Sequence, residues 1–305
     1  MANLFWKTKE KVVSLLSTPF KTEEEFEKII FDNREILGDI FPLKRQIRGG
    51  NKTGIPDIVG VDSDGNICIV EMKNVKVDAS IIPQVLQYAF WAETNPDSIK
   101  SLWLEAENKP DDITISWEDI DIRIIILAPD ILRSTLDIVD KINYQVDLIE
   151  AKRWVEADNQ LLLVNQLVRE EKPIKVKPIS GLGKYDDEFY KKQYNRRSAE
   201  QFLRYVAELE KLVKDKKWNL EKKFNKNYCG FKAGFFNVFG VHWMGSKTFA
   251  FFLKIGENDI KNLSPPFTRY AAPWKQAYYY IDPDSTKTKD FIPHFELAYK
   301  LLTGD

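Results

Sequence analysis

The sequence has little cysteine and histidine. Its 305 residues include two cysteines, Cys68 and Cys229, and two histidines, His242 and His294. The cysteines are far apart and form no Cys-x-x-Cys pair, so we expect neither a disulfide framework nor a zinc site. The chain also lacks an apolar run near the roughly 20 residues of a membrane span, and its first residues lack a signal-peptide core. We therefore expect a soluble, cytoplasmic protein with no membrane partner.

The sequence also has almost no net charge, but the net charges of its two halves are opposite in sign. Hydrophobic residues make up 44%, which is enough for two ordinary domains, and the formal net charge is -1. Residues 171–305 carry 25 Lys and Arg against 16 Asp and Glu, which leaves 20 against 30 for residues 1–170. If the protein binds nucleic acid, we expect the basic second half to contact the phosphates.

The most informative stretch is a predicted β-hairpin. Two β-branched apolar runs, 58–61 and 67–70, flank the turn-forming segment Asp62-Ser63-Asp64-Gly65-Asn66. The first strand begins at a carboxylate, Asp57. The second ends at Glu71 and Lys73, which share a face because they are two residues apart.

The turn decides whether Asp57 joins that face. A two-residue loop at Asp64-Gly65 would place Asp57 opposite Met72 and send it to the other face. A three-residue loop, with Gly65 at positive φ, would instead place Asp57 opposite Glu71.

Two carboxylates and an ammonium group on one face suit metal-assisted chemistry on phosphates. Mg²⁺ is typically held by one or two carboxylates together with water and phosphate oxygens. A neighbouring lysine can orient or deprotonate the attacking water, and it can offset charge that develops on the phosphate. The simpler alternative is an ordinary hairpin whose ends carry a surface salt bridge.

Pro56-Asp57, thirteen further residues and then Glu71-Met72-Lys73 resemble the PD-(D/E)xK nuclease superfamily. Residues 22–92 as a whole are similar to its EndoMS/NucS branch. The resemblance implies an α/β fold with a restriction endonuclease-like mixed-sheet core. It also implies that Asp57, Glu71 and the Met72 carbonyl hold Mg²⁺ or Mn²⁺, that Lys73 serves the water, and that DNA is the substrate.

Two neighbouring helices add residues to this site. Thr22 and Glu25 form a capping-box pattern that opens a helix. In the resembled family a glutamate of the first helix approaches the metal, and Glu23 and Glu27 are the candidates, with Glu23 preferred. The four glutamates of this helix start, Glu23, Glu24, Glu25 and Glu27, could equally be solvated or favour the helix dipole.

Gln84 and Tyr88 share one face of a helix predicted over 80–93. They match the Gln-x-x-x-Tyr element of several related nucleases, which implies that they hydrogen-bond around the site. The alternative is a helix that happens to carry polar residues.

The remaining elements complete two domains: 1–170, nuclease-like; 171–192, a linker; and 193–305, a smaller, basic, aromatic-rich α+β domain. In the first we expect helices over 4–16, 97–105 and 131–142, and strands over 41–47, 121–129, 145–155 and 160–168. In the second we expect helices over 198–217 and 288–302, and strands over 229–233, 235–243, 248–254 and 277–281.

Basic residues offer two surfaces for nucleic acid. The first is the loop 48–54, with Arg48 and Lys52, next to Lys44 and Arg45. The second is a lysine-rich segment with interleaved aromatics, which supplies charges for phosphates and rings for stacking. Its candidate residues are Lys217, Trp218, Lys222, Lys223 and Lys226. A solvated loop and a solvated helix end are the simpler interpretations.

These patterns predict a metal-dependent DNA endonuclease. A second hypothesis is a catalytically inactive nucleic-acid-binding protein that retains the nuclease fold, and a third is an interaction protein that ignores DNA. Many related nucleases dimerise to cut both strands, so a homodimer is an additional expectation by analogy.

Overall fold

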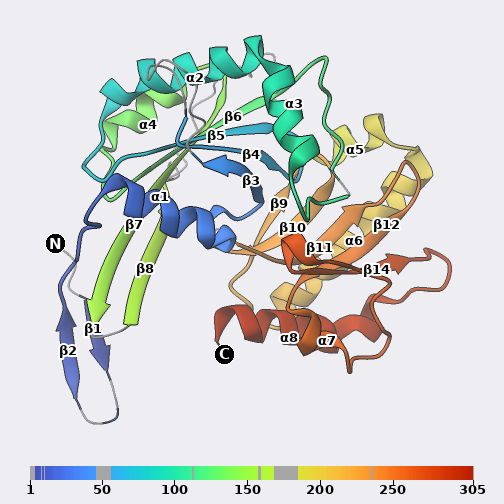
Figure 1. The fold of residues 1–305 in the computed structure, drawn as a ribbon. Coiled ribbons are helices and arrows are strands. Elements are labelled where there is room, and N and C mark those ends of the chain that lie inside the picture. Colours follow the sequence, from blue (N-terminus) through green and yellow to red (C-terminus); the bar gives the residue numbers. More distant parts are fainter. Residues whose placement is uncertain are drawn as a thin grey trace. The chain divides into compact units, whose positions relative to one another are not determined.

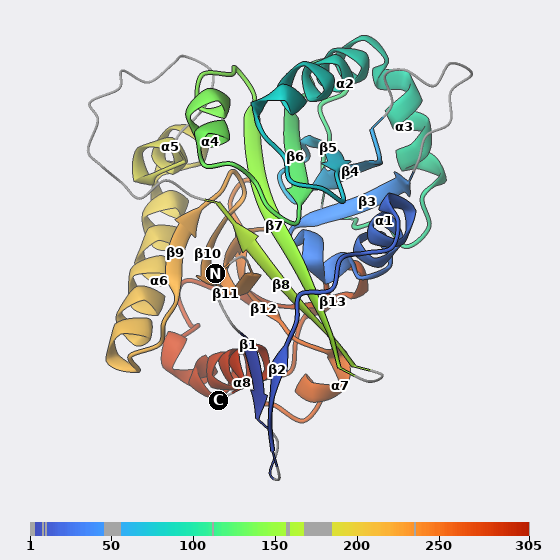
Figure 2. The ribbon, with the colours of Figure 1, turned by 90° about the vertical axis from the view of Figure 1, so that its left-hand side faces the viewer.

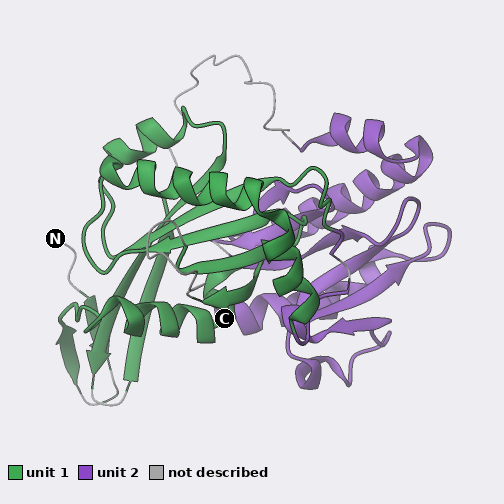
Figure 3. Cartoon of the chain, turned by 45° about the horizontal axis from the view of Figure 1, so that its top comes forward, with its two compact units in different colours: residues 1–106, 115–182 green, residues 107–114, 183–305 purple. Residues whose placement is uncertain are grey.

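The computed structural model describes residues 4–7, 9, 11–45, 56–111, 113–156, 159–167, 185–234 and 236–304. The chain divides into two compact units (Figure 3). The first contains residues 1–106 and 115–182, and the second contains residues 107–114 and 183–305. Within the described residues, no helix combines the length and apolar character of a membrane span.

The first unit is built on a six-stranded mixed sheet in the order β3-β4-β5-β6-β7-β8 (Figure 1). Its strands are β3 (Ile40–Arg45), β4 (Ile58–Asp62), β5 (Ile67–Met72), β6 (Ile122–Ala128), β7 (Gln145–Glu156) and β8 (Asn159–Gln166). The pairs β5-β6 and β6-β7 are parallel and the other pairs are antiparallel. This confirms the predicted α/β class and the predicted mixed sheet.

The central strands of this sheet form the hydrophobic core of the first unit. Every residue of β4, β5 and β6 is buried, as expected for strands covered on both faces. The helices are α1 (Glu23–Asp32), α2 (Ile82–Thr94), α3 (Pro96–Glu105) and α4 (Ser134–Val139), with the short 3-10 helices η1 (Arg34–Leu37) and η2 (Ala79–Ile81). Helix α2 packs on β5 and β6, and α1 contacts β3 and β5. Pro83 lies in the first turn of α2, where its missing N–H donor costs little because the helix has no acceptor for it there.

The predicted helix over 4–16 is wrong. The segment forms a two-stranded antiparallel hairpin of β1 (Leu4–Lys7) and β2 (Val12–Leu15). Leu4 lies opposite Leu15 and Trp6 opposite Val13, so these four apolar residues share one face of the pair. A short apolar pattern fits both the helical and the strand period. The β-branched residues Val12 and Val13 favour a strand.

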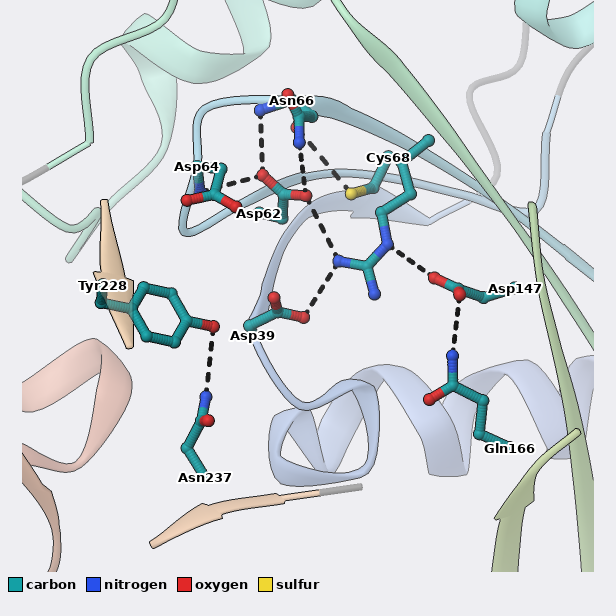
Figure 4. A network of polar contacts seen from close by, with 10 residues as sticks. Asp39, Asp62, Asp64, Asn66, Cys68, Asp147, Gln166, Tyr228 and Asn237 are labelled. Atoms are coloured by element: carbon teal, nitrogen blue, oxygen red, sulfur yellow. Dashed lines mark hydrogen bonds and ion pairs between the residues drawn. The ribbon is translucent and has the colours of Figure 1, made fainter. Parts of the chain in front are cut away.

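A buried ion network lies at the end of the sheet where β6 begins (Figure 4). The Arg123 guanidinium contacts three carboxylates, those of Asp147 at 2.7 Å, Asp39 at 3.0 Å and Asp62 at 3.2 Å. Asp62 Oδ1 also accepts hydrogen bonds from the amides of Asp64 and Asn66. The network therefore fixes the turn between β4 and β5.

The second unit is an antiparallel sheet covered by helices. The sheet order is β13-β14-β12-β11-β10-β9. Its strands are β9 (Glu221–Phe224), β10 (Tyr228–Ala233), β11 (Phe236–Trp243), β12 (Phe249–Lys254), β13 (Arg269–Ala271) and β14 (Gln276–Ile281). Its helices are α5 (Asp187–Gln193), α6 (Arg196–Asp215), α7 (Glu257–Ile260) and α8 (Ile292–Thr303), with η3 (Ala272–Trp274) and η4 (Thr288–Phe291). This is the predicted smaller α+β unit.

Helix α5 differs from the expected linker. It occupies part of 171–192, and Asp186 caps it by accepting a hydrogen bond from the Phe189 amide. Tyr190 of this helix is fully buried and packs against Phe202 of α6. The chain therefore folds into the second unit before residue 193.

Candidate active site

The hairpin register brings the motif residues together. Ile58 pairs with Val70 and Val61 with Ile67, so the next step along the ladder places Asp57 opposite Glu71. At the turn, the amide of Gly65 bonds the Asp62 carbonyl, and Gly65 has a φ of 87°. This is the three-residue loop that puts both carboxylates on one face.

The backbone and Lys73 hold one oxygen of each carboxylate. The Met72 amide donates a 2.7 Å hydrogen bond to Oδ2 of Asp57. Lys73 Nζ lies 2.6 Å from Oε1 of Glu71, whose side chain is 1% exposed. The other oxygen of Glu71, Oε2, is buried and has no hydrogen-bond partner.

This packing changes the acidity of the site. Burial and the nearby Glu71 charge raise the pKa of Asp57 to about 7, against the opposing effect of the Met72 amide. Burial also raises the pKa of Glu71, although Lys73 lowers it. The two carboxylates raise the pKa of Lys73 and keep it protonated, which outweighs its own burial. The site thus strongly favours a bound positive charge.

Gln84 and Tyr88 also lie together. Gln84 Nε2 donates a 2.6 Å hydrogen bond to the Tyr88 hydroxyl, one helical turn away in α2. Burial raises the pKa of Tyr88, and the charges of Glu71 and Asp57 raise it further. The hydroxyl therefore lies within electrostatic reach of the motif carboxylates.

The first helix brings one glutamate near the motif. Thr22 caps α1 through a 3.0 Å bond from the Glu25 amide, as the capping-box pattern predicts. Glu23 is exposed, and its charge contributes to the raised pKa of both Glu71 and Lys73. Glu27 is buried, at 5% exposure. The charge of Glu23 therefore acts on the motif, and the choice between Glu23 and Glu27 stays a prediction.

Two residues that sequence reasoning missed fix the start of α1. Asn74, directly after the motif lysine, donates a 2.7 Å bond to the Phe20 carbonyl, and its position next to Lys73 is a signal that could have found it. Arg153 of β7 bonds the carbonyls of Thr18 and Pro19. Arg153 is 135 residues from Thr18 and 134 from Pro19 in the sequence, so no local pattern identifies it.

The structure describes only some of the candidate nucleic-acid-binding residues of the first unit. Arg48 and Lys52 lie outside the described residues. Lys44 is exposed near the end of β3. Arg45 bonds the Glu24 carbonyl at 3.3 Å, so this side chain supports α1.

In the second unit, some residues of the lysine-rich segment contact other residues of the unit. The Trp218 ring stacks on Tyr299 at 4.7 Å and contacts Phe239, so it is a packing residue and not the open stacking platform that its sequence context indicated. Lys222 pairs with Glu210 at 2.6 Å. Lys217 follows α6 with a φ of 56°, and both Lys217 and Lys223 are exposed, whereas Lys226 is half-buried.

The residues present fit a hard divalent cation. Among the described residues, no group of three or more His, Cys, Asp or Glu could hold a metal. Two carboxylates, one with an unpartnered buried oxygen, match the small protein contribution that Mg²⁺ or Mn²⁺ needs when water and phosphate complete the shell. Met72 follows Glu71 directly, so its carbonyl is the nearest backbone candidate for a further ligand.

No protein-family model matches the chain. Two solved structures overlap with about half of it. One is a repair endonuclease from Pyrococcus abyssi, with a TM-score of 0.28, 21% identity, and coverage of 48% of this chain and 65% of that one. The other is an EndoMS-dsDNA complex, with a TM-score of 0.28, 19% identity and the same coverage. At these TM-scores the likeness is too weak to define a shared fold.

Sequence similarity to curated proteins is local. Endonuclease NucS from Pyrococcus horikoshii and from Thermococcus kodakarensis are each 38% identical over 68 residues, which is 22% of this chain and 26% of theirs. Endonuclease NucS from Pyrococcus furiosus is 26% identical over 153 residues, 48% of each chain. The chain thus spans about a quarter to a half of the length of these relatives. Together with the motif geometry, the similarity supports the resemblance of this chain to NucS-like nucleases.

Proposed function

We propose that this protein is a metal-dependent endonuclease that hydrolyses DNA phosphodiester bonds, with Mg²⁺ or Mn²⁺ as its cofactor. The observation that carries the proposal is the contact of two carboxyl groups on one face of the hairpin. The side chains of Asp57 and Glu71 interact directly, and Oε2 of Glu71 is buried with no amide or hydroxyl donor. Two buried carboxylates in contact repel each other unless a proton or a cation lies between them.

The chain's own residues would prepare the site for that ion. The Met72 amide orients Asp57, and Lys73 orients Glu71. Each carboxylate is thereby held by one oxygen, which limits the reorganisation needed on binding. When bound, a divalent cation would polarise the phosphate and lower the pKa of a water.

Lys73 would then act as a cation and not as a base. Its raised pKa keeps the ammonium group protonated. In that form it can position a water by hydrogen bonding and offset negative charge on the phosphate as the bond breaks. Gln84, Tyr88 and Glu23 would support the site from the two helices.

DNA as the substrate is proposed from the named relatives and from the charge of this chain. The curated relatives are named as endonucleases. The exposed Lys217 and Lys223 are candidate phosphate contacts in the second unit. Phosphate contacts of this kind bind with a salt-dependent affinity and little sequence preference.

The test is cleavage of labelled single-stranded, duplex, branched and mismatched DNA with Mg²⁺, with Mn²⁺ and with EDTA. We expect metal-dependent cleavage by the wild type and loss of about a hundredfold or more in Glu71→Gln. Asp119→Asn, at an exposed aspartate of the same unit, is the control and should cleave normally. Salt-dependent DNA binding with no cleavage would instead support the inactive DNA-binding protein, and cleavage by Glu71→Gln at the wild-type rate would refute the assignment.

A further inference from the structure

The N-terminal hairpin of β1 and β2 is a two-stranded sheet of its own. Figures 1 and 2 both show it extending past the far ends of β7 and β8. Phe5 and Val12 are each 59% exposed, and Trp6 is 42% exposed. An isolated hairpin is marginally stable in water, and a cluster of exposed apolar side chains indicates an interaction surface. The hairpin therefore has the character of a binding element.

The two faces of the hairpin differ in exposure. The face that carries Trp6 is partly covered, because its Leu15 is buried and its Leu4 and Val13 are half-buried. The other face is open, and every side chain on it is exposed. These side chains form two cross-strand pairs, Phe5 with Ser14 and Lys7 with Val12. The open face thus combines two apolar groups with an ammonium group and a hydroxyl group.

The hairpin is also a basic segment of an acidic unit. Residues 1–21 contain four lysines and one glutamate, which leaves 16 Lys and Arg against 29 Asp and Glu for residues 22–170. Lys7 lies on the open face, and the exposed Lys9 and Lys11 follow it between the two strands. Lysines beside apolar side chains match DNA, which presents a negative backbone together with the apolar groups of its bases.

The base of the hairpin is fixed at the edge of the sheet where the motif ends. Ser17 forms an antiparallel β-bridge with Trp154, near the end of β7. Three residues later, the Phe20 carbonyl accepts a 2.7 Å hydrogen bond from Asn74, which directly follows Lys73. The hairpin is therefore anchored between the ends of β5 and β7. A polymer bound at the motif can reach it without leaving the first unit.

We propose that this hairpin is a DNA-binding arm that contacts duplex DNA beside the proposed metal site. A two-stranded β-ribbon fits the major groove, which is about 12 Å wide. Each strand has four residues and is about 13 Å long, which matches that width. Lys7 and Lys9 bind phosphates at the sides of the groove, and Phe5 contacts the base edges. This inference rests on the proposed function, because it takes DNA as the substrate.

Binding of duplex DNA at several salt concentrations tests the role of the lysines. It is measured in EDTA on a Glu71→Gln background, so that no cleavage occurs. In this background, Lys7→Gln combined with Lys9→Gln should weaken binding at least tenfold. It should also lower the slope of log affinity against log salt by about two, because each phosphate contact contributes about 0.9 to that slope. Lys7→Arg combined with Lys9→Arg keeps both charges and should keep the affinity and the slope.

The matched control removes the same charge from exposed lysines elsewhere in the first unit. Lys28 of α1 and Lys141, which follows α4, are both exposed. Lys28→Gln combined with Lys141→Gln should keep the salt slope of the background protein. Equal slopes for this variant and for the Lys7 and Lys9 glutamine variant would overturn the proposal.

Phe5→Ser tests the contact with the bases. It should weaken duplex binding about fivefold or more and leave the salt slope unchanged, because the lost contact is apolar. Phe90→Ser is the control, at a phenylalanine of α2 that is 53% exposed, and it should bind DNA as the background protein does. Equal effects of the two serine substitutions would contradict the groove contact and overturn the proposal.

Cleavage by the wild type in Mg²⁺ separates this inference from the proposed function. Metal-dependent cleavage together with DNA binding that ignores Lys7 and Lys9 would overturn the arm and retain the nuclease. Hairpin-dependent binding with no cleavage would support the arm and contradict the nuclease. Two further results would overturn the arm. One is the absence of DNA binding at low salt, and the other is hairpin-dependent binding to vesicles of anionic phospholipid while DNA binding is unchanged by the lysine substitutions.

Discussion

The backbone amide of Met72 donates a 2.7 Å hydrogen bond to Oδ2 of Asp57, so the strand that carries Glu71 also holds the second carboxylate. The proposed metal site therefore depends on the hairpin register more than on any neighbouring element. The register in turn depends on the turn at Gly65, where φ is 87°.

Replacing Gly65 should destabilise the protein. A side chain at this φ is strained, and a β-branched one most of all, so Gly65→Val should lower the free energy of unfolding by about 1 to 2 kcal/mol. Gly65→Asn should cost less, because asparagine tolerates positive φ better. Urea unfolding measures both. Equal stability of Gly65→Val and the wild type would contradict the turn described here.

The metal-free protein should lose stability as pH rises. The folded-state pKa of Asp57 is about 7, above its ordinary value near 4, because of burial and the Glu71 charge. Folded Asp57 thus retains its proton more strongly than the unfolded chain, and the stability it contributes is lost between about pH 4 and pH 7. Asp57→Asn should remove this pH-dependent loss of stability. At about pH 8 in EDTA, its free energy of unfolding should exceed that of the wild type by on the order of 2 kcal/mol.

Unfolding in denaturant at several pH values measures this difference, with Asp119→Asn as the control for the loss of one exposed carboxylate. A stability difference between Asp57→Asn and the wild type that does not change with pH would contradict the raised pKa.

Lys73→Met should separate metal binding from cleavage. Lys73 occupies Oε1 of Glu71 at 2.6 Å and competes with a cation, so its loss should leave Mn²⁺ affinity unchanged or higher. Cleavage should fall by about a hundredfold, because the charge that offsets the phosphate is gone. Lys76→Met, at an exposed lysine paired with Asp130, should change neither property. Loss of metal binding in Lys73→Met would assign this lysine a structural role instead.

Arg153 should be important for stability although it is far from the motif in sequence. It is 5% exposed and bonds the Thr18 and Pro19 carbonyls and the Glu25 carboxylate. Arg153→Met should cost about 2 to 4 kcal/mol, because it leaves these groups unpaired. Arg196→Met, at an exposed arginine of α6, should cost at most about 0.5 kcal/mol. Urea unfolding measures both variants. Similar losses in the free energy of unfolding would contradict the structural role assigned to the hydrogen bonds of Arg153.

Local patterns predicted the hairpin and most of the sheet. The runs 58–61 and 67–70 are apolar on both faces. Gly65 has no Cβ and so tolerates the positive φ of the turn, and sequence alone narrowed the strand register to two choices. Gln84 and Tyr88 were placed together by helical spacing, and they form a hydrogen bond. These features are local, and so they can be read from neighbouring residues.

The misses have long-range or ambiguous causes. The segment 4–16 fits helix and strand periods equally until cross-strand pairs such as Leu4 and Leu15 are known. Arg153 and Arg123 contact segments that are far from them in sequence, so no local pattern reveals these contacts. The packing of Trp218 on Tyr299 likewise depends on α8, at the other end of the unit.

The most direct test of the account is an equilibrium titration of the full-length protein with Mn²⁺, followed by calorimetry in the absence of DNA. We predict one site per chain, with affinity reduced at least tenfold by Asp57→Asn and by Glu71→Gln alike, and unchanged in Asp119→Asn. If either of the first two variants binds Mn²⁺ as tightly as the wild type, the two carboxylates do not share one ion and the central claim is wrong.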